Sequence, residues 1–166
     1  GYALGNVPEA QALVGAAGAI WDSAGDQNGT ENPWVLQEAE ARGLTATFAY
    51  VHADPYDAWA SDVKGVVQRA NKPTDGRMVD AEVFVDSYVI GAKNFKAFQE
   101  AHADNENADF IFLENISKPR LLESLPDDAH GYDSENLLEH AHDTIADRSD
   151  TLRAAVIRGA MIGQRL

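Results

Sequence analysis

The chain has 166 residues, 45% of them hydrophobic, and its 27 acidic and 13 basic residues give a formal net charge of −14. This length and composition predict a single globular domain with a buried core. The acidic balance argues against nucleic acid as a partner, because phosphate backbones bind basic surfaces. The absence of cysteine excludes disulfides, thiol catalysis and cysteine zinc sites. No apolar run is long enough for a membrane span and no secretory signal opens the chain, so we expect a cytoplasmic protein without a membrane partner.

The first part of the chain predicts helices that alternate with strands. Residues 7–17 are rich in alanine and predict a short helix, and the apolar residues 19–21 predict a buried strand. A second helix is expected from residue 33 to about residue 42, because a proline opens it and Gly43 follows its end. Residues 45–52 are β-branched and aromatic, and they give the clearest strand of the chain.

Two helices are expected after this strand. Asp54 is expected to cap a helix that begins at Pro55 and buries one side, which consists of Trp59, Val63, Val66 and Val67. After residue 77, large residues and one glycine recur at intervals of three and four, namely Phe84, Tyr88, Gly91, Phe95 and Phe98. This spacing predicts a long helix, to about residue 101, with one buried face.

The remainder of the chain predicts a strand, an irregular stretch and two helices. Residues 109–115 form a nearly continuous apolar run, which is typical of a strand buried on both faces of a parallel sheet. Residues 116–133 contain two prolines and a glycine and are expected to be irregular. Residues 134–146 and 149–164 predict helices. This order of elements predicts an α/β fold, with a parallel sheet and helices on both of its faces.

Two arginines, Arg69 and Arg77, flank a turn-forming stretch that contains Pro73 and Gly76. Guanidinium groups bind phosphate oxygens in a planar fork. Residues 60–99 hold six basic and five acidic residues in an otherwise strongly acidic chain, which favours an anionic ligand here. The sequence therefore predicts a lid over a phosphorylated ligand. The alternative is that both arginines are solvated surface residues.

The three predicted strands end in polar residues, at Asp22, His52 and Glu114. Parallel α/β sheets bind ligands at the carboxyl ends of their strands, so these positions are candidate ligand contacts. No metal site is predicted, since His140 and His142 are two residues apart on a predicted helix and face different ways.

Three stretches resemble the later part of the zeta-toxin family of P-loop kinases, over about residues 19–115. They are an acid-hydroxyl-glycine segment at residues 21–26, a glycine turn into a strand at residues 40–55, and a helix–loop–helix that carries Arg69 and Arg77. The resemblance implies a P-loop-kinase-like fold. It also implies an ATP-dependent enzyme that phosphorylates a small molecule such as UDP-N-acetylglucosamine.

The resemblance also implies roles for particular residues. By position, Arg69 and Arg77 would bind the triphosphate and stabilise the transferring phosphoryl group, and Asp22, Ser23 and Asp26 would line the acceptor pocket. The implied cofactors are ATP and Mg²⁺. The implied partners are the nucleotide, the small-molecule acceptor, and an antitoxin or an upstream segment of the polypeptide.

One departure from the family concerns catalysis. Family members begin with a strand and a phosphate-binding loop, G-x-x-x-x-G-K-[ST], and this chain contains no such motif. We therefore expect ATP and Mg²⁺ to bind only where the missing first strand and loop are supplied. The chain is then the later portion of a longer polypeptide, or another segment or chain fills the gap, or the domain has lost the loop and no longer catalyses. The abrupt start at Gly1 favours the first account.

A rival hypothesis is a non-catalytic binding or assembly module that retains the fold. Residues 100–150 hold 14 acidic residues against three basic ones, which suits a surface for a basic partner. A solvated, solubilising face explains the same charge.

Overall fold

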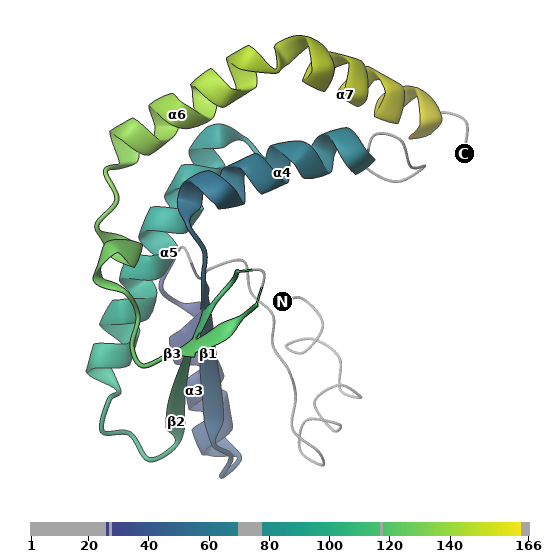
Figure 1. Ribbon diagram of the computed structural model, residues 1–166. Coiled ribbons are helices and arrows are strands. Elements are labelled where there is room, and N and C mark those ends of the chain that lie inside the picture. Colours follow the sequence, from purple (N-terminus) through teal and green to yellow (C-terminus); the bar gives the residue numbers. More distant parts are fainter. Residues whose placement is uncertain (1–25, 27, 70–77, 117, 164–166) are drawn as a thin grey trace. The chain divides into compact units, whose positions relative to one another are not determined.

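The computed structural model of the protein describes residue 26 and residues 28–69, 78–116 and 118–163 (Figure 1). The described elements are, in chain order, α3 (Glu31–Ala41), β1 (Ala46–His52), α4 (Pro55–Arg69), α5 (Ala81–Ala101), β2 (Ala108–Glu114), β3 (Arg120–Leu122), the 3-10 helix η1 (Asp127–His130), α6 (Ser134–Asp147) and α7 (Ser149–Gly163). The chain is therefore α/β, as predicted. It divides into two compact units, which we call the sheet unit (Gly1–Val51 and Ile90–His130) and the helical unit (His52–Val89 and Gly131–Leu166).

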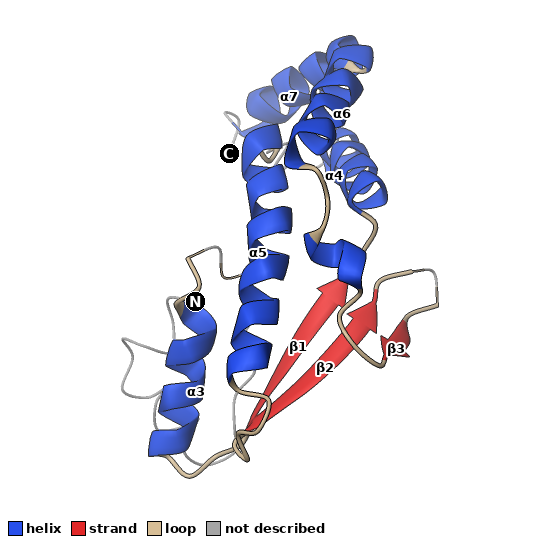
Figure 2. Ribbon diagram, turned by 90° about the vertical axis from the view of Figure 1, so that its left-hand side faces the viewer, coloured by secondary structure: helices blue, strands red, loops and turns tan. Residues whose placement is uncertain are grey.

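The sheet unit contains a three-stranded sheet with the order β1-β2-β3. β1 and β2 point the same way in Figure 2, which is expected for strands joined by a helical crossover. β3 runs antiparallel to β2, with Leu122 opposite Phe112 and Leu121 opposite Leu113. The sheet is therefore mixed rather than purely parallel.

The prediction that residues 116–133 are irregular is wrong at β3 and at η1. A strand of three residues is too short to show an alternating pattern, and Pro119 directly before it conceals the signal further. This segment forms a strand because it contacts residues that are far away in the sequence: Leu122 packs against the core of the sheet unit. The connection between β2 and β3 is short, whereas a parallel pair needs a long crossover connection, so β3 pairs with β2 in the antiparallel direction.

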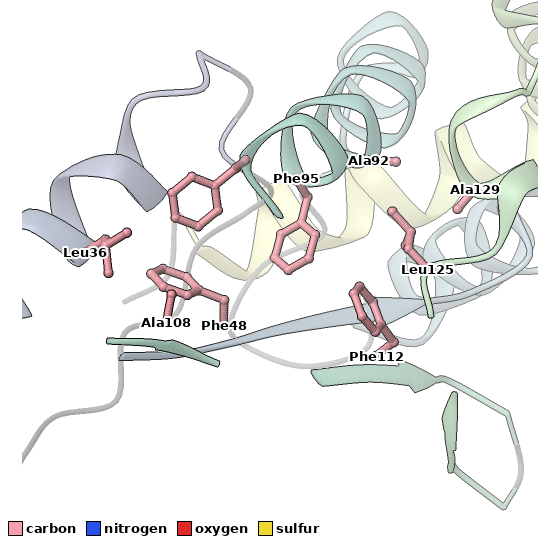
Figure 3. Packing of buried hydrophobic residues seen from close by; sticks show 9 residues of the cluster. Leu36, Phe48, Ala92, Phe95, Ala108, Phe112, Leu125 and Ala129 are labelled. Carbon is pink, nitrogen blue, oxygen red and sulfur yellow. The ribbon is translucent and has the colours of Figure 1, made fainter. Parts of the chain in front are cut away.

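α3 and the second half of α5 cover one face of the sheet (Figure 2). Figure 3 shows Phe95 pointing from α5 toward the sheet, between Phe48 of β1 and Phe112 of β2. The Phe48 ring also meets Phe98 of α5 edge-on, with 4.8 Å between ring centroids. The buried cluster consists of Leu36, Phe48, Ala92, Phe95, Phe98, Ala108, Phe112, Leu125 and Ala129. The predicted buried face of the long helix is thus confirmed in this unit.

The helical unit is built from α4, the first half of α5, α6 and α7. Its core consists of Trp59, Val63, Val66, Ala81, Ala141 and Leu152. Three of these residues lie on the side of α4 that the sequence predicted to be buried. The predicted cap is also confirmed, because Oδ1 of Asp54 accepts hydrogen bonds from the backbone N–H groups of Tyr56 (2.9 Å) and Asp57 (3.0 Å).

The ends of the other helices lie close to their predicted positions. α3 begins two residues before the predicted residue 33 and ends before Gly43, which has a φ of +65°. The N–H groups of Gly43 and Leu44 donate to carbonyl oxygens of the last turn of α3, a pairing that closes the helix. α6 and α7 match their predicted ranges within one residue. The predicted helix at residues 7–17 and the predicted strand at residues 19–21 lie outside the described residues.

Replacing Trp59 with alanine should lower the free energy of unfolding of the helical unit by roughly 3–5 kcal/mol, because the side chain is fully buried and leaves a cavity. Trp34 on α3 is exposed, so Trp34→Ala should cost much less. Urea denaturation followed by circular dichroism measures both variants. Equal losses would contradict the packing described for Trp59.

Candidate functional site

Arg69 is the last residue of α4, at the position the sequence predicted for the helix that precedes the arginine loop. Its guanidinium lies back along the helix, with Nη2 at 3.6 Å from Oδ1 of Asp62, two turns earlier. The side chain of Arg69 is 43% exposed. The arginine is therefore accessible from solvent while it contacts an acid of its own helix.

Gly65 makes room for this conformation of Arg69. A Cβ atom at position 65 would lie 3.1 Å from Nη1 of Arg69 and 3.6 Å from its Cζ. The guanidinium thus lies over the glycine, and a Cβ atom at this position would require it to shift by a few tenths of an ångström. Glycine in a helix interior costs roughly 0.5–1 kcal/mol relative to alanine. Gly65 therefore lowers the stability of α4 slightly and leaves room for the guanidinium of Arg69.

The contact between Asp62 and Arg69 is weak enough for a ligand to displace it. Partly exposed ion pairs contribute about 0–1 kcal/mol. A phosphate group accepts two parallel N–H bonds from one guanidinium, which is a stronger and more directional interaction. A phosphorylated ligand would therefore compete well with Asp62 for the side chain of Arg69.

Asp26 has a structural role that the sequence did not reveal. Its Oδ1 accepts hydrogen bonds from the backbone N–H groups of Thr30 (2.8 Å) and Glu31 (2.9 Å), and its Oδ2 accepts one from Asn32 (3.0 Å). These groups belong to the start of α3, where a helix has no backbone acceptors for its first N–H groups. A carboxylate there also interacts favourably with the positive end of the helix. The buried side chain of Asp26 therefore fixes the start of α3.

The main chain of Asp26 also joins α3 to α5. Its carbonyl oxygen accepts hydrogen bonds from the N–H of Gly29 (2.9 Å) and from Nδ2 of Asn94 on α5 (3.0 Å). Capping rules did not identify this residue, because it lies four residues before the cap position occupied by Thr30. A role for Asp26 in the acceptor pocket stays a prediction, and its carboxylate would have to serve the ligand in addition to α3.

The polar residues that follow β1 and β2 make contacts of their own. His52 is 8% exposed, and its Nδ1 has no hydrogen-bond partner among the described residues. Asp54 caps α4. Glu114 ends β2 and forms an ion pair with Arg120 of β3. Both carboxylates therefore contribute to local structure, whatever else they do.

Other catalytic chemistry finds little support in the described part of the chain. It contains no cluster of three or more His, Asp or Glu residues that could hold a metal ion. Burial raises the pKa of Tyr50 to about 12, so its hydroxyl stays protonated at neutral pH and is not a base. The ring of His140 packs edge-on against the ring of Tyr56, with 4.6 Å between the ring centroids. Within the same residues, no helix is long and apolar enough to cross a membrane.

Arg77, Asp22 and Ser23 lie outside the described residues, so their convergence with Arg69 stays a prediction. No protein-family model, no curated protein and no solved structure matches the chain. The resemblance to zeta toxins therefore depends on the sequence motifs alone.

Asp26→Ala should destabilise the sheet unit by about 2 kcal/mol, because three backbone N–H groups of α3 lose their acceptor. Asp26→Asn should cost less, since it keeps one acceptor oxygen and asparagine tolerates the φ of +35° found here. Urea denaturation of the two variants is the measurement. Wild-type stability in the alanine variant would contradict the capping role.

Proposed function

We propose that this chain is the lid-and-acceptor portion of a zeta-toxin-like, ATP-dependent kinase that phosphorylates a small molecule. The observation that carries the proposal is the position of Arg69. It ends α4 directly before the connection to α5, and its guanidinium is partly exposed beside Asp62. The order β1, α4, α5, β2, with both strands pointing the same way, is compatible with a P-loop-kinase-like sheet (Figure 2).

The proposed chemistry assigns charge stabilisation to the arginines. In phosphoryl transfer, negative charge spreads over the oxygens of the transferring group, and catalysis depends on positioning and on cations near those oxygens. Arg69 and Arg77 would contact these oxygens. Asp22, Ser23 and Asp26 would contact the acceptor, for which UDP-N-acetylglucosamine is the example that the family suggests.

The nucleotide would need a segment that this chain does not contain. ATP phosphates are held by backbone N–H groups of a glycine-rich loop at a helix N-terminus, and Mg²⁺ by a hydroxyl of that loop. Arg69 and Arg77 supply positive charge but no such cradle. The proposal therefore includes an upstream segment, or a second chain, that carries the loop and with it the ATP and Mg²⁺ site.

Joining a strand and a G-x-x-x-x-G-K-[ST] loop upstream of the chain should produce ATP–Mg²⁺ binding and phosphorylation of a small molecule. In that protein, Arg69→Ala should lower kcat by roughly 10³-fold or more and weaken nucleotide binding less, because the contact strengthens in the transition state. Lys64→Ala is the matched control, since it removes an exposed cation from the same helix. It should leave kcat nearly unchanged.

Steady-state kinetics and calorimetric titration of ATP–Mg²⁺ measure these effects. Equal losses in the Arg69 and Lys64 variants would remove Arg69 from the mechanism. The 166-residue chain alone should show no micromolar binding of ATP–Mg²⁺. Such binding would reveal a different nucleotide site and contradict the need for the loop.

A non-catalytic binding or assembly module is the second candidate, and the charge on two helices favours it. The exposed acids of α6 and of the start of α7 are Glu135, Glu139, Asp143, Asp147 and Asp150. A basic partner would associate with this surface, and its association would weaken as salt is added. Turnover in the protein with the restored loop separates this candidate from the kinase.

A further inference from the structure

The single Asn-Gly pair of the chain, Asn28-Gly29, lies in the sheet unit shortly before α3. Both residues are exposed to solvent. Gly29 has a φ of +64°, in the left-handed region that glycine adopts without strain. In an Asn-Gly pair, the asparagine side chain can react with the main chain, because glycine has no side chain to obstruct the approach.

This reaction needs only water in addition to the chain. The main-chain nitrogen of Gly29 attacks Cγ of Asn28, so that a new N–Cγ bond forms and the Cγ–Nδ2 bond breaks. The side-chain nitrogen leaves as ammonia, with the proton that the Gly29 nitrogen has lost, and a cyclic succinimide remains. Water then opens the ring at either carbonyl carbon. One product has the ordinary main chain and a carboxylate side chain, and in the other the main chain runs through the former side chain.

A hydrogen bond restrains the nitrogen that would attack. The N–H of Gly29 donates to the main-chain oxygen of Asp26, with 2.9 Å between nitrogen and oxygen. An amide proton held in this way leaves its nitrogen only when the surrounding structure opens locally. The nitrogen of Gly29 is therefore a poor nucleophile while this bond is formed.

Contacts with α5 and α3 keep this bond in place. The main-chain oxygen of Asp26 also accepts a hydrogen bond from Nδ2 of Asn94 on α5 (3.0 Å). A Cβ atom at Gly29 would lie 3.5 Å from the same Nδ2, so the glycine lies against the Asn94 side chain. The buried carboxylate of Asp26 accepts three N–H groups at the start of α3. Local opening around Gly29 must therefore disturb a connected set of hydrogen bonds.

We propose that Asn28 is a site of spontaneous deamidation, and that Asn94 and the main chain of Asp26 control its rate by keeping the N–H of Gly29 bonded. The inference concerns the covalent stability of the sheet unit. It does not depend on the proposed kinase function.

Deamidation weakens the attachment of α3. Either product adds a negative charge at position 28, in a chain whose net charge is already −14. The product with the altered linkage also has an additional carbon atom in the main chain between Asp26 and Thr30. The N–H groups of Gly29 and Thr30 then shift relative to the oxygens of Asp26 that accept them. Converted molecules therefore hold the start of α3 less firmly.

The test incubates the full chain at mildly alkaline pH and follows position 28 by peptide mapping with mass spectrometry. The folded wild-type protein should convert slowly. In urea it should convert several-fold faster, because denaturation breaks the hydrogen bond between Gly29 and Asp26. Asn28→Gln assigns the signal, since a glutamine side chain would have to form a larger ring and should not convert on this timescale.

Two further variants separate local opening from a general loss of stability. Asn94→Ala removes the donor to the main-chain oxygen of Asp26 and should speed conversion of the folded protein several-fold. Asn105→Ala is the matched control, because it removes a side-chain amide that donates to Oε1 of Glu40, at the other end of α3 (2.8 Å). It should leave the rate nearly unchanged.

Each outcome decides one part of the proposal. No conversion at position 28 in urea would overturn the site. Equal rates in buffer and in urea, or equal acceleration in the Asn94 and Asn105 variants, would overturn the control of its rate. Converted molecules, separated by ion exchange, should unfold at a lower urea concentration than intact ones, and equal midpoints would contradict the weakened attachment of α3.

Hydrogen exchange of the wild-type protein decides the matter if circular dichroism shows that the Asn94 variant does not fold. The N–H of Gly29 should exchange at least several-fold more slowly than in the urea-denatured chain, because it donates to Asp26. Equal exchange rates would overturn the proposed control.

Discussion

One helix, α5, supplies buried side chains to both hydrophobic cores of the protein. Ala81 near its start belongs to the core of the helical unit, whereas Ala92, Phe95 and Phe98 belong to the core of the sheet unit. The aromatic residues of its second half contact rings of both long strands, so the pairing of β1 with β2 and the packing of α5 stabilise each other. Both cores therefore include side chains of this helix. The regular spacing of its buried residues is therefore the main constraint on the sequence.

Many of the acidic residues near the starts of helices stabilise those helices. Asp26, Asp54, Asp80 and Asp133 each accept backbone N–H groups at the start of α3, α4, α5 and α6 respectively. Carboxylates at these places satisfy unpaired donors and interact favourably with the helix dipole. The surplus acids on α6 have no such contacts at a helix start. A basic partner could bind to these acids of α6.

The sequence predicted the elements whose signals are local and periodic. β1, β2 and the helices α4 to α7 follow from strand composition, helical spacing and the Asp54 cap. The sequence did not predict two features that depend on contacts between residues distant from the expected positions. β3 is a strand because Leu122 packs against the core of the sheet unit. Asp26 accepts hydrogen bonds from the start of α3 although it lies outside the cap position. The sequence predicted Arg69 at the end of a helix, but nothing in it indicated that Gly65 lets the guanidinium lie over α4. Such contacts depend on the conformation of a side chain, which no residue pattern specifies.

We propose that Arg69 belongs to a kinase whose phosphate-binding loop lies outside these 166 residues. The most direct test is to isolate the native gene product from its cells and determine its intact mass and N-terminal sequence. We expect a longer polypeptide with G-x-x-x-x-G-K-[ST] upstream of Gly1, or a tightly associated chain that carries this loop. A native protein that begins at or near Gly1, alone and without such a companion, would contradict it and favour the non-catalytic module.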